Sequence, residues 1–145
     1  MAELSIEEKI ALSTYRFQKS KEALSDAVSN FNGKTYKTSV NRSYYAVLHT
    51  ARSLLILKGV DLLRHEGVVT MLSLHFIKSN LLPTECVRIF KHLLSMRTDV
   101  DYGDFDVITM QDAEDAVQQA KRFIEIAAPV REQLIRELND MSTKG

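Results

Sequence analysis

The chain has 145 residues, of which 45% are hydrophobic, and its 19 basic and 19 acidic residues balance to a formal net charge of zero. This length suits one domain with a single core, and the apolar fraction argues against a disordered chain. The charge balance excludes a general electrostatic attraction to nucleic acid or to an anionic membrane, although a local basic patch is compatible with it.

The chain carries a single cysteine, Cys86, so it can form neither an intramolecular disulfide nor a paired-cysteine zinc site. A lone thiol fits the reducing cytosol. The N-terminal residues lack the charged-then-apolar pattern of a secretion signal. No apolar run approaches the roughly 20 residues needed to span a bilayer. We therefore predict a cytoplasmic protein.

Hydrophobic periodicity predicts a first helix that begins after Ser5 and ends near Asn32. Ser5 and Glu8 have the spacing of a capping box, and the pair Asn32-Gly33 is typical of a helix end and a turn. The apolar stripe of this helix consists of Ile10, Phe17, Leu24, Val28 and Phe31.

A second helix is predicted from about Thr38 to Lys58, with Gly59 as its C-terminal signal. Its apolar residues recur at steps of three and four along one side. A third helix is expected to begin near His65 and to end before Asn80.

Pro83 and Thr84 are expected to open a fourth helix, because proline is well tolerated at a helix start. Thr109 is predicted to cap a fifth, with Asp112 placed favourably for the helix dipole. Pro129 is expected to interrupt or kink this last helix.

The sequence shows no strand alternation, internal repeat or low-complexity segment. The helices and their short connections indicate an all-α fold, an antiparallel up-and-down bundle of about five helices, four of which form the core. We expect a single domain over residues 1–145 with a frayed tail at about 140–145.

Common catalytic signatures are missing: the sequence has no phosphate-binding Walker loop, nucleophile elbow, dinucleotide-binding glycine turn or paired-histidine zinc motif. The segment HEGVV begins like a zinc-protease motif, but position 69 is valine where a second histidine is required. The four histidines are spread over three predicted helices. We therefore predict neither a metal site nor a cofactor.

A polar strip follows the second predicted helix. Asn41, Tyr45, His49 and Arg52 recur at steps of 4, 4 and 3, so they share one side of the helix beside its apolar stripe. Their amide, phenol, imidazole and guanidinium groups suit a phosphate, a base or a partner helix. The alternative is an ordinary solvated flank, which the strip alone favours because every amphipathic helix has one.

Arg97 occupies an unexpected position in the fourth predicted helix. It falls in register with the apolar residues Phe90 and Leu94, so it should point toward the packed side. A buried guanidinium without a partner is costly. Asp101 lies one turn further on, and Tyr102 follows it. The sequence allows two interpretations: a local Arg97–Asp101 pair near a helix end, or an arginine held at a cleft that is suited to phosphate oxygens.

Three segments of the chain, taken in order, resemble one protein family. They are NRSYYAVLHTARSLLILKGV, RHEGVVTMLSLHFIKSN and RIFKHLLSMRTDVDYGDF. Together they are similar to the HEPN family (higher eukaryotes and prokaryotes nucleotide-binding domains), in particular its small stand-alone prokaryotic members. The resemblance covers about Ser5 to Leu138. Its most telling parts are Asn41-Arg42-x-Tyr44-Tyr45, His65 followed by Gly67-Val68, and Arg97 leading to Asp101-Tyr102.

The resemblance implies a helical bundle that usually forms a homodimer and often pairs with a small nucleotidyltransferase in a toxin–antitoxin system. Many HEPN proteins are metal-independent endoribonucleases, whose motif is an arginine followed, after four to six residues, by a histidine. Such a site needs a group that moves the proton of a 2′-hydroxyl or leaving oxygen, and a cation on the scissile phosphate.

The sequence departs from that motif at its histidine. Arg97 matches the motif arginine, but Tyr102 occupies the place nearest to the expected histidine. A tyrosine with a pKa of about 10 is a poor general base near neutral pH, although it suits hydrogen bonding to a phosphate or stacking on a base. Nearby carboxylates would also repel an RNA backbone unless cations offset them.

The leading hypothesis is therefore a dimeric HEPN protein that binds a nucleotide, RNA or a nucleotidyltransferase and has weak catalytic activity or none. In it Arg97 contacts phosphate, Asp101 orients Arg97, and Tyr102 stacks or forms a hydrogen bond. Asn41, Tyr45, His49 and Arg52 of the second helix are the remaining candidate ligand-binding residues.

Two alternatives remain open from the sequence. One is an endoribonuclease toxin in which His49 or Tyr102 replaces the missing histidine as the proton carrier. The other is a structural helical adaptor, in which the Arg97–Asp101 pair only secures the bundle.

Overall fold

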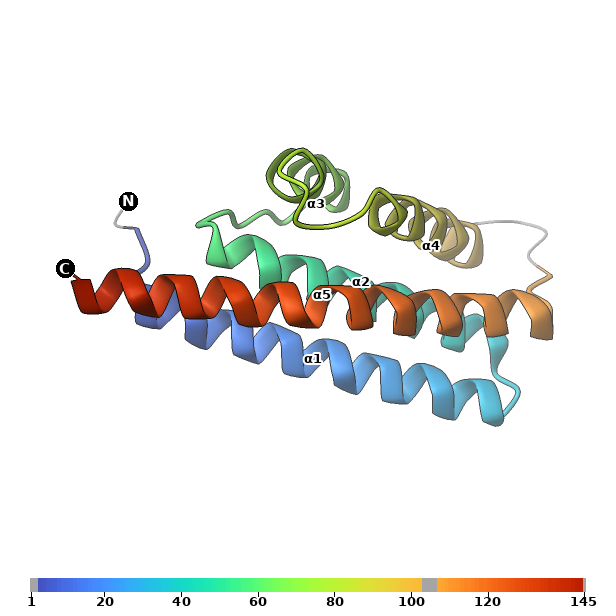
Figure 1. Ribbon diagram of the computed structural model, residues 1–145. Coiled ribbons are helices and arrows are strands. Elements are labelled where there is room, and N and C mark those ends of the chain that lie inside the picture. Colours follow the sequence, from blue (N-terminus) through green and yellow to red (C-terminus); the bar gives the residue numbers. More distant parts are fainter. Residues whose placement is uncertain (1–2, 103–106, 145) are drawn as a thin grey trace.

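The computed structural model describes residues 3–102 and 107–144, and only the backbone of residues 99–102 and 144. These residues form five α-helices without any strand, as Figure 1 shows. The helices are α1 (Ile6–Asn32), α2 (Tyr36–Leu57), α3 (His65–Leu72), α4 (Glu85–Tyr102) and α5 (Met110–Lys144). A π-helical segment, η1 (Ser73–Ile77), continues α3. The predicted all-α bundle is confirmed.

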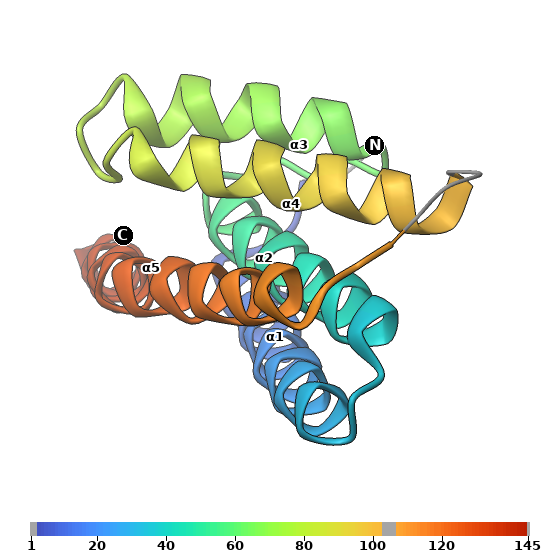
Figure 2. The ribbon, with the colours of Figure 1, turned by 90° about the vertical axis from the view of Figure 1, so that its right-hand side faces the viewer.

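The helix α2 lies at the centre of the bundle. Helices α1 and α5 run along it, with α1 antiparallel to α2, so that both chain ends lie at the same end of the molecule (Figure 1). Helices α3 and α4 form an antiparallel pair that crosses over α2 (Figure 2). Each of the other four α-helices contacts α2. Side chains of α2 are therefore placed within reach of every other part of the fold.

Local capping chemistry fixes two helix starts. The Ser5 hydroxyl accepts a hydrogen bond from the Glu8 N–H at 3.1 Å, and the Glu8 carboxylate accepts one from the Ser5 N–H at 2.9 Å. Thr109 and Asp112 make the same reciprocal pair at 3.1 and 3.0 Å. Gly59 follows α2 with a φ of +77°, a conformation that glycine adopts without strain. These three boundary predictions are confirmed.

The last helix contains a proline. Pro129 lies inside α5, which continues to Lys144, so Pro129 does not interrupt the helix. The alternative, a kink at Pro129, stays a prediction. Proline removes a backbone donor. The helix persists because Ala127 and Leu134, on either side of Pro129, are buried in the same core and tertiary packing supplies most helical stability.

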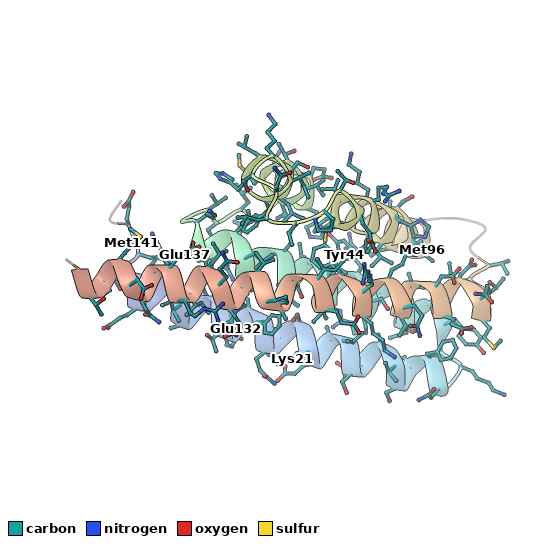
Figure 3. The ribbon with its side chains drawn as sticks, viewed as in Figure 1. Lys21, Tyr44, Met96, Glu132, Glu137 and Met141 are labelled. Carbon is teal, nitrogen blue, oxygen red and sulfur yellow. The ribbon has the colours of Figure 1, made fainter. Side chains whose placement is uncertain are left out.

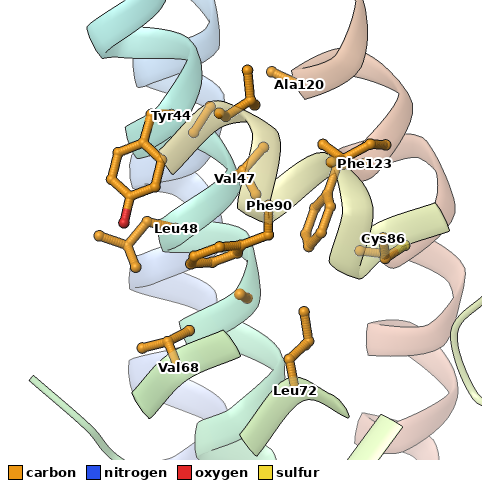
Figure 4. Packing of buried hydrophobic residues seen from close by; sticks show 14 of the residues in the cluster. Tyr44, Val47, Leu48, Val68, Leu72, Cys86, Phe90, Ala120 and Phe123 are labelled. Atoms are coloured by element: carbon orange, nitrogen blue, oxygen red, sulfur yellow. The ribbon is translucent and has the colours of Figure 1, made fainter. Parts of the chain in front are cut away.

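The core fills the space between α2 and the helices around it. Its largest fully buried side chains are the rings of Tyr44, Phe76, Phe90 and Phe123, and Figure 4 shows three of them within the packed cluster. Burial also raises the pKa of the Cys86 thiol to about 12. This thiol therefore stays protonated at neutral pH and is a poor nucleophile.

A buried arginine ties α5 to α1. Arg131 is only 6% exposed. Its Nε donates to the Ser13 hydroxyl at 3.0 Å and its Nη2 donates to the Thr14 hydroxyl at 2.6 Å. The Ser13 hydroxyl in turn donates to the Ser53 carbonyl of α2 at 2.7 Å. Because these bonds and the face of the Phe17 ring, 4.9 Å away, satisfy the guanidinium, its role is structural.

We expect Phe90→Ala to lower the free energy of unfolding by about 3–5 kcal/mol, because it opens a cavity where the ring is fully buried. Urea titration measures this loss. Leu63→Ala is the control, since Leu63 is 87% exposed and its truncation should change stability by less than about 0.5 kcal/mol. Equal losses in the two variants would contradict the packing described above.

Candidate functional site

Helices α2, α3 and α4 bring together Arg97, Tyr44, Tyr45 and His65, which we call the arginine–tyrosine cluster. The Arg97 Nη2 donates to the Tyr45 hydroxyl at 3.3 Å. The central guanidinium carbon lies 5.8 Å from the Tyr44 ring centre and 5.7 Å from that of Tyr45. The cluster thus holds a cation against two phenol rings.

The register of α4 places Arg97 in this cluster. The same side of α4 carries Phe90 and Leu93, which are fully buried, and the Phe90 ring meets the Tyr44 ring edge-on at 5.8 Å. Arg97 lies further along this side, and its side chain is half-buried. The prediction that Arg97 faces the packed side of its helix is confirmed.

Tyr44 connects the core to the cluster. Its ring is buried, and it lies on the side of α2 that faces the α3–α4 pair (Figure 3). Its hydroxyl is 2.7 Å from His65 Nδ1, a hydrogen-bonding distance. Burial raises the pKa of Tyr44 well above that of a free tyrosine. Tyr44 is therefore a neutral phenol at any physiological pH.

His65 begins α3 and is neutral at pH 7. Partial burial, and then the charge of Arg97, lower the pKa of His65 below its usual value. Its ring lies 5.4 Å from that of Tyr44 and 6.3 Å from that of Tyr45. The bond to Tyr44 uses Nδ1, so Nε2 is the nitrogen that remains for a ligand. In the tautomer whose Nδ1–H donates to the Tyr44 hydroxyl, Nε2 has a free lone pair and can accept a proton.

The predicted polar strip of α2 joins the cluster at Tyr45. The His49 ring lies 6.1 Å from the Tyr45 ring, at the border of the cluster. The Arg42 guanidinium covers the Tyr45 ring at 4.9 Å, and its Nε and Nη2 donate to the Asn41 side-chain oxygen at 3.1 and 2.9 Å. Asn41 therefore orients Arg42, which lies beside the site.

Arg52 forms its hydrogen bond outside the cluster, with Asp61, although its charge also lowers the pKa of His65. Its Nη2 lies 3.2 Å from Asp61 Oδ1, and the same carboxylate oxygen lies 3.0 Å from Arg16 Nη2 of α1. The predicted strip is therefore divided between two places on α2. Tyr45 contacts Arg97, whereas His49 and Arg52 line a pocket with residues of α1.

Asp101 and Tyr102 end α4, but their side chains lie outside the described residues. The Arg97–Asp101 pair and a ligand contact by Tyr102 therefore stay predictions.

Sequence reasoning missed two members of the cluster. Tyr44 has the spacing of the apolar stripe, and His65 looks like one of four scattered histidines. Their contact joins residues 21 positions apart on different helices. The signal that could have found them is the pair of family fragments, Tyr44-Tyr45 and His65-x-Gly67, which occur together in the resemblance.

Metal-binding and membrane-spanning features are absent from the part of the chain that the structure describes. There, no three or more histidine, cysteine, aspartate or glutamate side chains gather as they would around a metal ion. Within the same residues, no helix combines the length and the apolar character needed to cross a membrane.

Comparison with known proteins settles the family. The HEPN domain matches residues 13–133. The chain belongs to the HEPN family. It is 33% identical to "Putative toxin MJ0605" of Methanocaldococcus jannaschii, over 72% of this chain and 77% of that protein. It is 26% identical to a "UPF0332 protein" of Thermotoga maritima, over 89% of this chain and 98% of the relative.

A second archaeal relative has a similar name. The HEPN chain is 26% identical to "Putative toxin MJ0142" of Methanocaldococcus jannaschii, over 74% of this chain and 73% of that protein. The family resemblance predicted from the sequence is therefore confirmed, and two relatives carry toxin names.

We expect Arg97→Gln to raise the pKa of His65, because removing a nearby cation makes protonation of the imidazole less unfavourable. An NMR pH titration of the ring protons measures it. The pKa of His49 is an internal control, since the cations that depress it are Arg52, Arg42, Lys19 and Arg16 and not Arg97. An unchanged His65 pKa in a folded variant would contradict the geometry of the cluster.

Proposed function

We propose that this HEPN protein binds RNA through the arginine–tyrosine cluster, with Arg97 on a backbone phosphate. The observation that carries the proposal is the half-buried Arg97, held against two tyrosine rings and hydrogen-bonded to the Tyr45 hydroxyl at 3.3 Å. We further propose that the protein works in the cytoplasm as a homodimer, within a toxin–antitoxin pair whose other member is a small nucleotidyltransferase.

The chemistry of the cluster supports a phosphate ligand. A guanidinium offers donors in a fixed fork that matches phosphate oxygens. The phenol rings lower the local dielectric, which strengthens the attraction between Arg97 and an anion. They also restrict the arginine, so that less side-chain entropy is lost on binding. Arg42, above the Tyr45 ring at 4.9 Å, adds a second cation beside the first.

The biological setting rests on the family. Two relatives are named as toxins, and pairing with a nucleotidyltransferase and dimerisation are common properties of the proteins that the sequence resembles. In this proposal Asp101 orients Arg97, and Tyr102 contacts the RNA. A free nucleotide is an alternative ligand in this proposal, because it offers Arg97 the same phosphate group as RNA in a smaller molecule.

A second function, metal-independent RNA cleavage, is favoured by the position of His65. Cleavage needs a proton carrier as well as a cation, and the motif histidine that should follow Arg97 is missing. His65 comes from α3 instead, and both it and Arg97 contact the Tyr44 ring. When its Nδ1–H donates to the Tyr44 hydroxyl, its Nε2 is the nitrogen that accepts the proton of a 2′-hydroxyl. His65 is therefore a better-placed proton carrier than His49.

We expect Arg97→Gln to weaken RNA binding at least tenfold, since a charge-assisted hydrogen bond contributes about 1.5–3 kcal/mol and about 1.4 kcal/mol corresponds to tenfold. Fluorescence anisotropy with a labelled single-stranded RNA measures it at fixed salt. Arg88→Gln is the matched control, because it removes the same charge from an exposed position on α4.

The same variants separate binding from a structural role. If Arg97→Gln lowers the melting temperature but binds RNA as well as Arg88→Gln does, Arg97 only secures the bundle and the structural adaptor is correct. If the wild-type protein binds neither RNA, nucleotides nor a co-expressed nucleotidyltransferase, the proposed function is wrong.

For the nuclease, we expect RNA cleavage in the presence of a chelator, and a loss of about 100-fold or more in His65→Gln, which removes the proton carrier. Gel analysis of a labelled RNA measures the rate. His92→Gln, an exposed histidine on α4, should cleave at the wild-type rate. A wild-type protein that binds RNA but leaves it intact over long incubation would rule out the enzyme and keep the binding function.

A further inference from the structure

A polar pocket of about 580 Å³ lies between α1 and α2. It is distinct from the arginine–tyrosine cluster, because none of Arg97, Tyr44, Tyr45 or His65 lines it. Helix α1 contributes two cations and α2 contributes two more beside a histidine. The basic lining residues are Arg16, Lys19, Arg42, His49 and Arg52.

Two of these arginines share one counter-charge. Arg16 and Arg52 reach the same oxygen of Asp61, at 3.0 and 3.2 Å, and their side chains are 12% and 23% exposed. Among the described residues, the buried Nε of Arg52 has no hydrogen-bond partner. Asp61 therefore neutralises only one of two closely placed guanidinium groups, and the pair keeps a positive charge.

The other two cations have little compensation within the pocket. Lys19 lies 3.6 Å from Glu22, and both side chains are about half exposed. Within the described part of the chain, Arg42 has no carboxylate at ion-pair distance and is held only by Asn41 and the Tyr45 ring. Each of the four cations also has N–H groups beyond those bonded to these partners, and an anion entering the pocket can accept hydrogen bonds from them.

The imidazole of His49 reports the combined effect of these cations. After burial, the charges that lower its pKa are those of Arg52, Arg42, Lys19 and Arg16. No carboxylate counts among the causes. Although Glu22 and Asp26 also line the pocket, the potential at His49 is thus positive, as an anion-binding site requires.

We propose that the α1–α2 pocket is a second phosphate-binding site, which holds another phosphate of the strand that Arg97 contacts. Guanidinium groups with uncommitted donors favour phosphate oxygens, which accept several bonds at once. The pocket adjoins the cluster, because Arg42 lines the pocket and also covers the Tyr45 ring at 4.9 Å. Only the identity of the ligand as RNA rests on the proposed function; the phosphate site does not.

Lys19 and Lys21 provide a matched pair of variants. Both are exposed on α1, and each lies over an aromatic ring, at 5.5 Å from Tyr15 and 4.9 Å from Phe17 respectively. Lys19 lines the pocket and Lys21 does not. Lys19→Gln and Lys21→Gln therefore each remove one positive charge beside an aromatic ring of α1. Lys19→Gln also removes the exposed ion pair with Glu22, which contributes little to stability, and only this variant should change binding in the pocket.

The direct test is an NMR titration of the full chain with inorganic pyrophosphate. We expect the His49 ring signals to shift and the pKa of His49 to rise on saturation, because a bound anion offsets the four cations. Lys19→Gln should weaken pyrophosphate binding about fivefold relative to Lys21→Gln, as for a partly exposed charge contact. Unshifted His49 signals, or equal affinities of the two variants, would overturn the proposal.

A second arm uses single-stranded RNA and a nucleoside diphosphate to identify the source of the phosphate. If the pocket binds RNA, Lys19→Gln weakens RNA binding and lowers its salt slope by about 0.7 relative to Lys21→Gln. If the two variants differ only in their affinity for the nucleoside diphosphate, the pocket binds the phosphate of free nucleotides. The proposal that one RNA strand contacts both the pocket and Arg97 is then wrong. If the wild-type protein binds no RNA, the proposed function fails, while the pyrophosphate titration still decides the pocket.

Discussion

The burial of α2 is the constraint on which the rest of the structure depends. Fourteen of its 22 residues are buried, and three of its four buried serine and threonine hydroxyls, those of Ser39, Thr50 and Ser53, donate to a backbone carbonyl. The Ser39 hydroxyl donates to the Ala27 carbonyl of α1 at 2.8 Å, and the Ser53 carbonyl accepts from the Ser13 hydroxyl at 2.7 Å. These short side chains let α1 approach closely, and Arg131 then extends the same network to α5.

This burial also determines where function can lie. Most sides of α2 are covered by other helices. Its partly exposed polar side chains lie along one strip, between α1 on one side and the α3–α4 pair on the other, and a ligand can contact α2 there. The adjacent residues Tyr44 and Tyr45 have different roles at this strip. Tyr44 fills the core and holds His65 through its hydroxyl, whereas the half-buried Tyr45 binds Arg97. The Tyr44 ring belongs both to the core and to the arginine–tyrosine cluster, so core packing and site geometry are coupled.

The arginines have two different roles, one structural and one electrostatic. Arg131 is buried among hydroxyl groups and the Phe17 ring, and it joins helices. Arg97, Arg42, Arg16 and Arg52 lie instead around the strip of α2, where they create a local positive potential in a chain whose total charge is zero. The balanced total therefore says little about binding, because electrostatic attraction depends on where charges lie within a Debye length of about 8–10 Å.

The sequence by itself determined the helices, two of their caps, the inward direction of Arg97 and the family, because spacing along one helix and capping bonds three residues apart are local. It left open whether Pro129 interrupts or only kinks the last helix, and packing on both sides of Pro129 keeps α5 continuous. Only the tertiary structure decided that His65 lies beside Tyr44 in the cluster of Arg97, and that Arg52 shares Asp61 with Arg16. Those contacts cross between elements, so they depend on how the helices pack around α2, which no spacing within a single helix encodes.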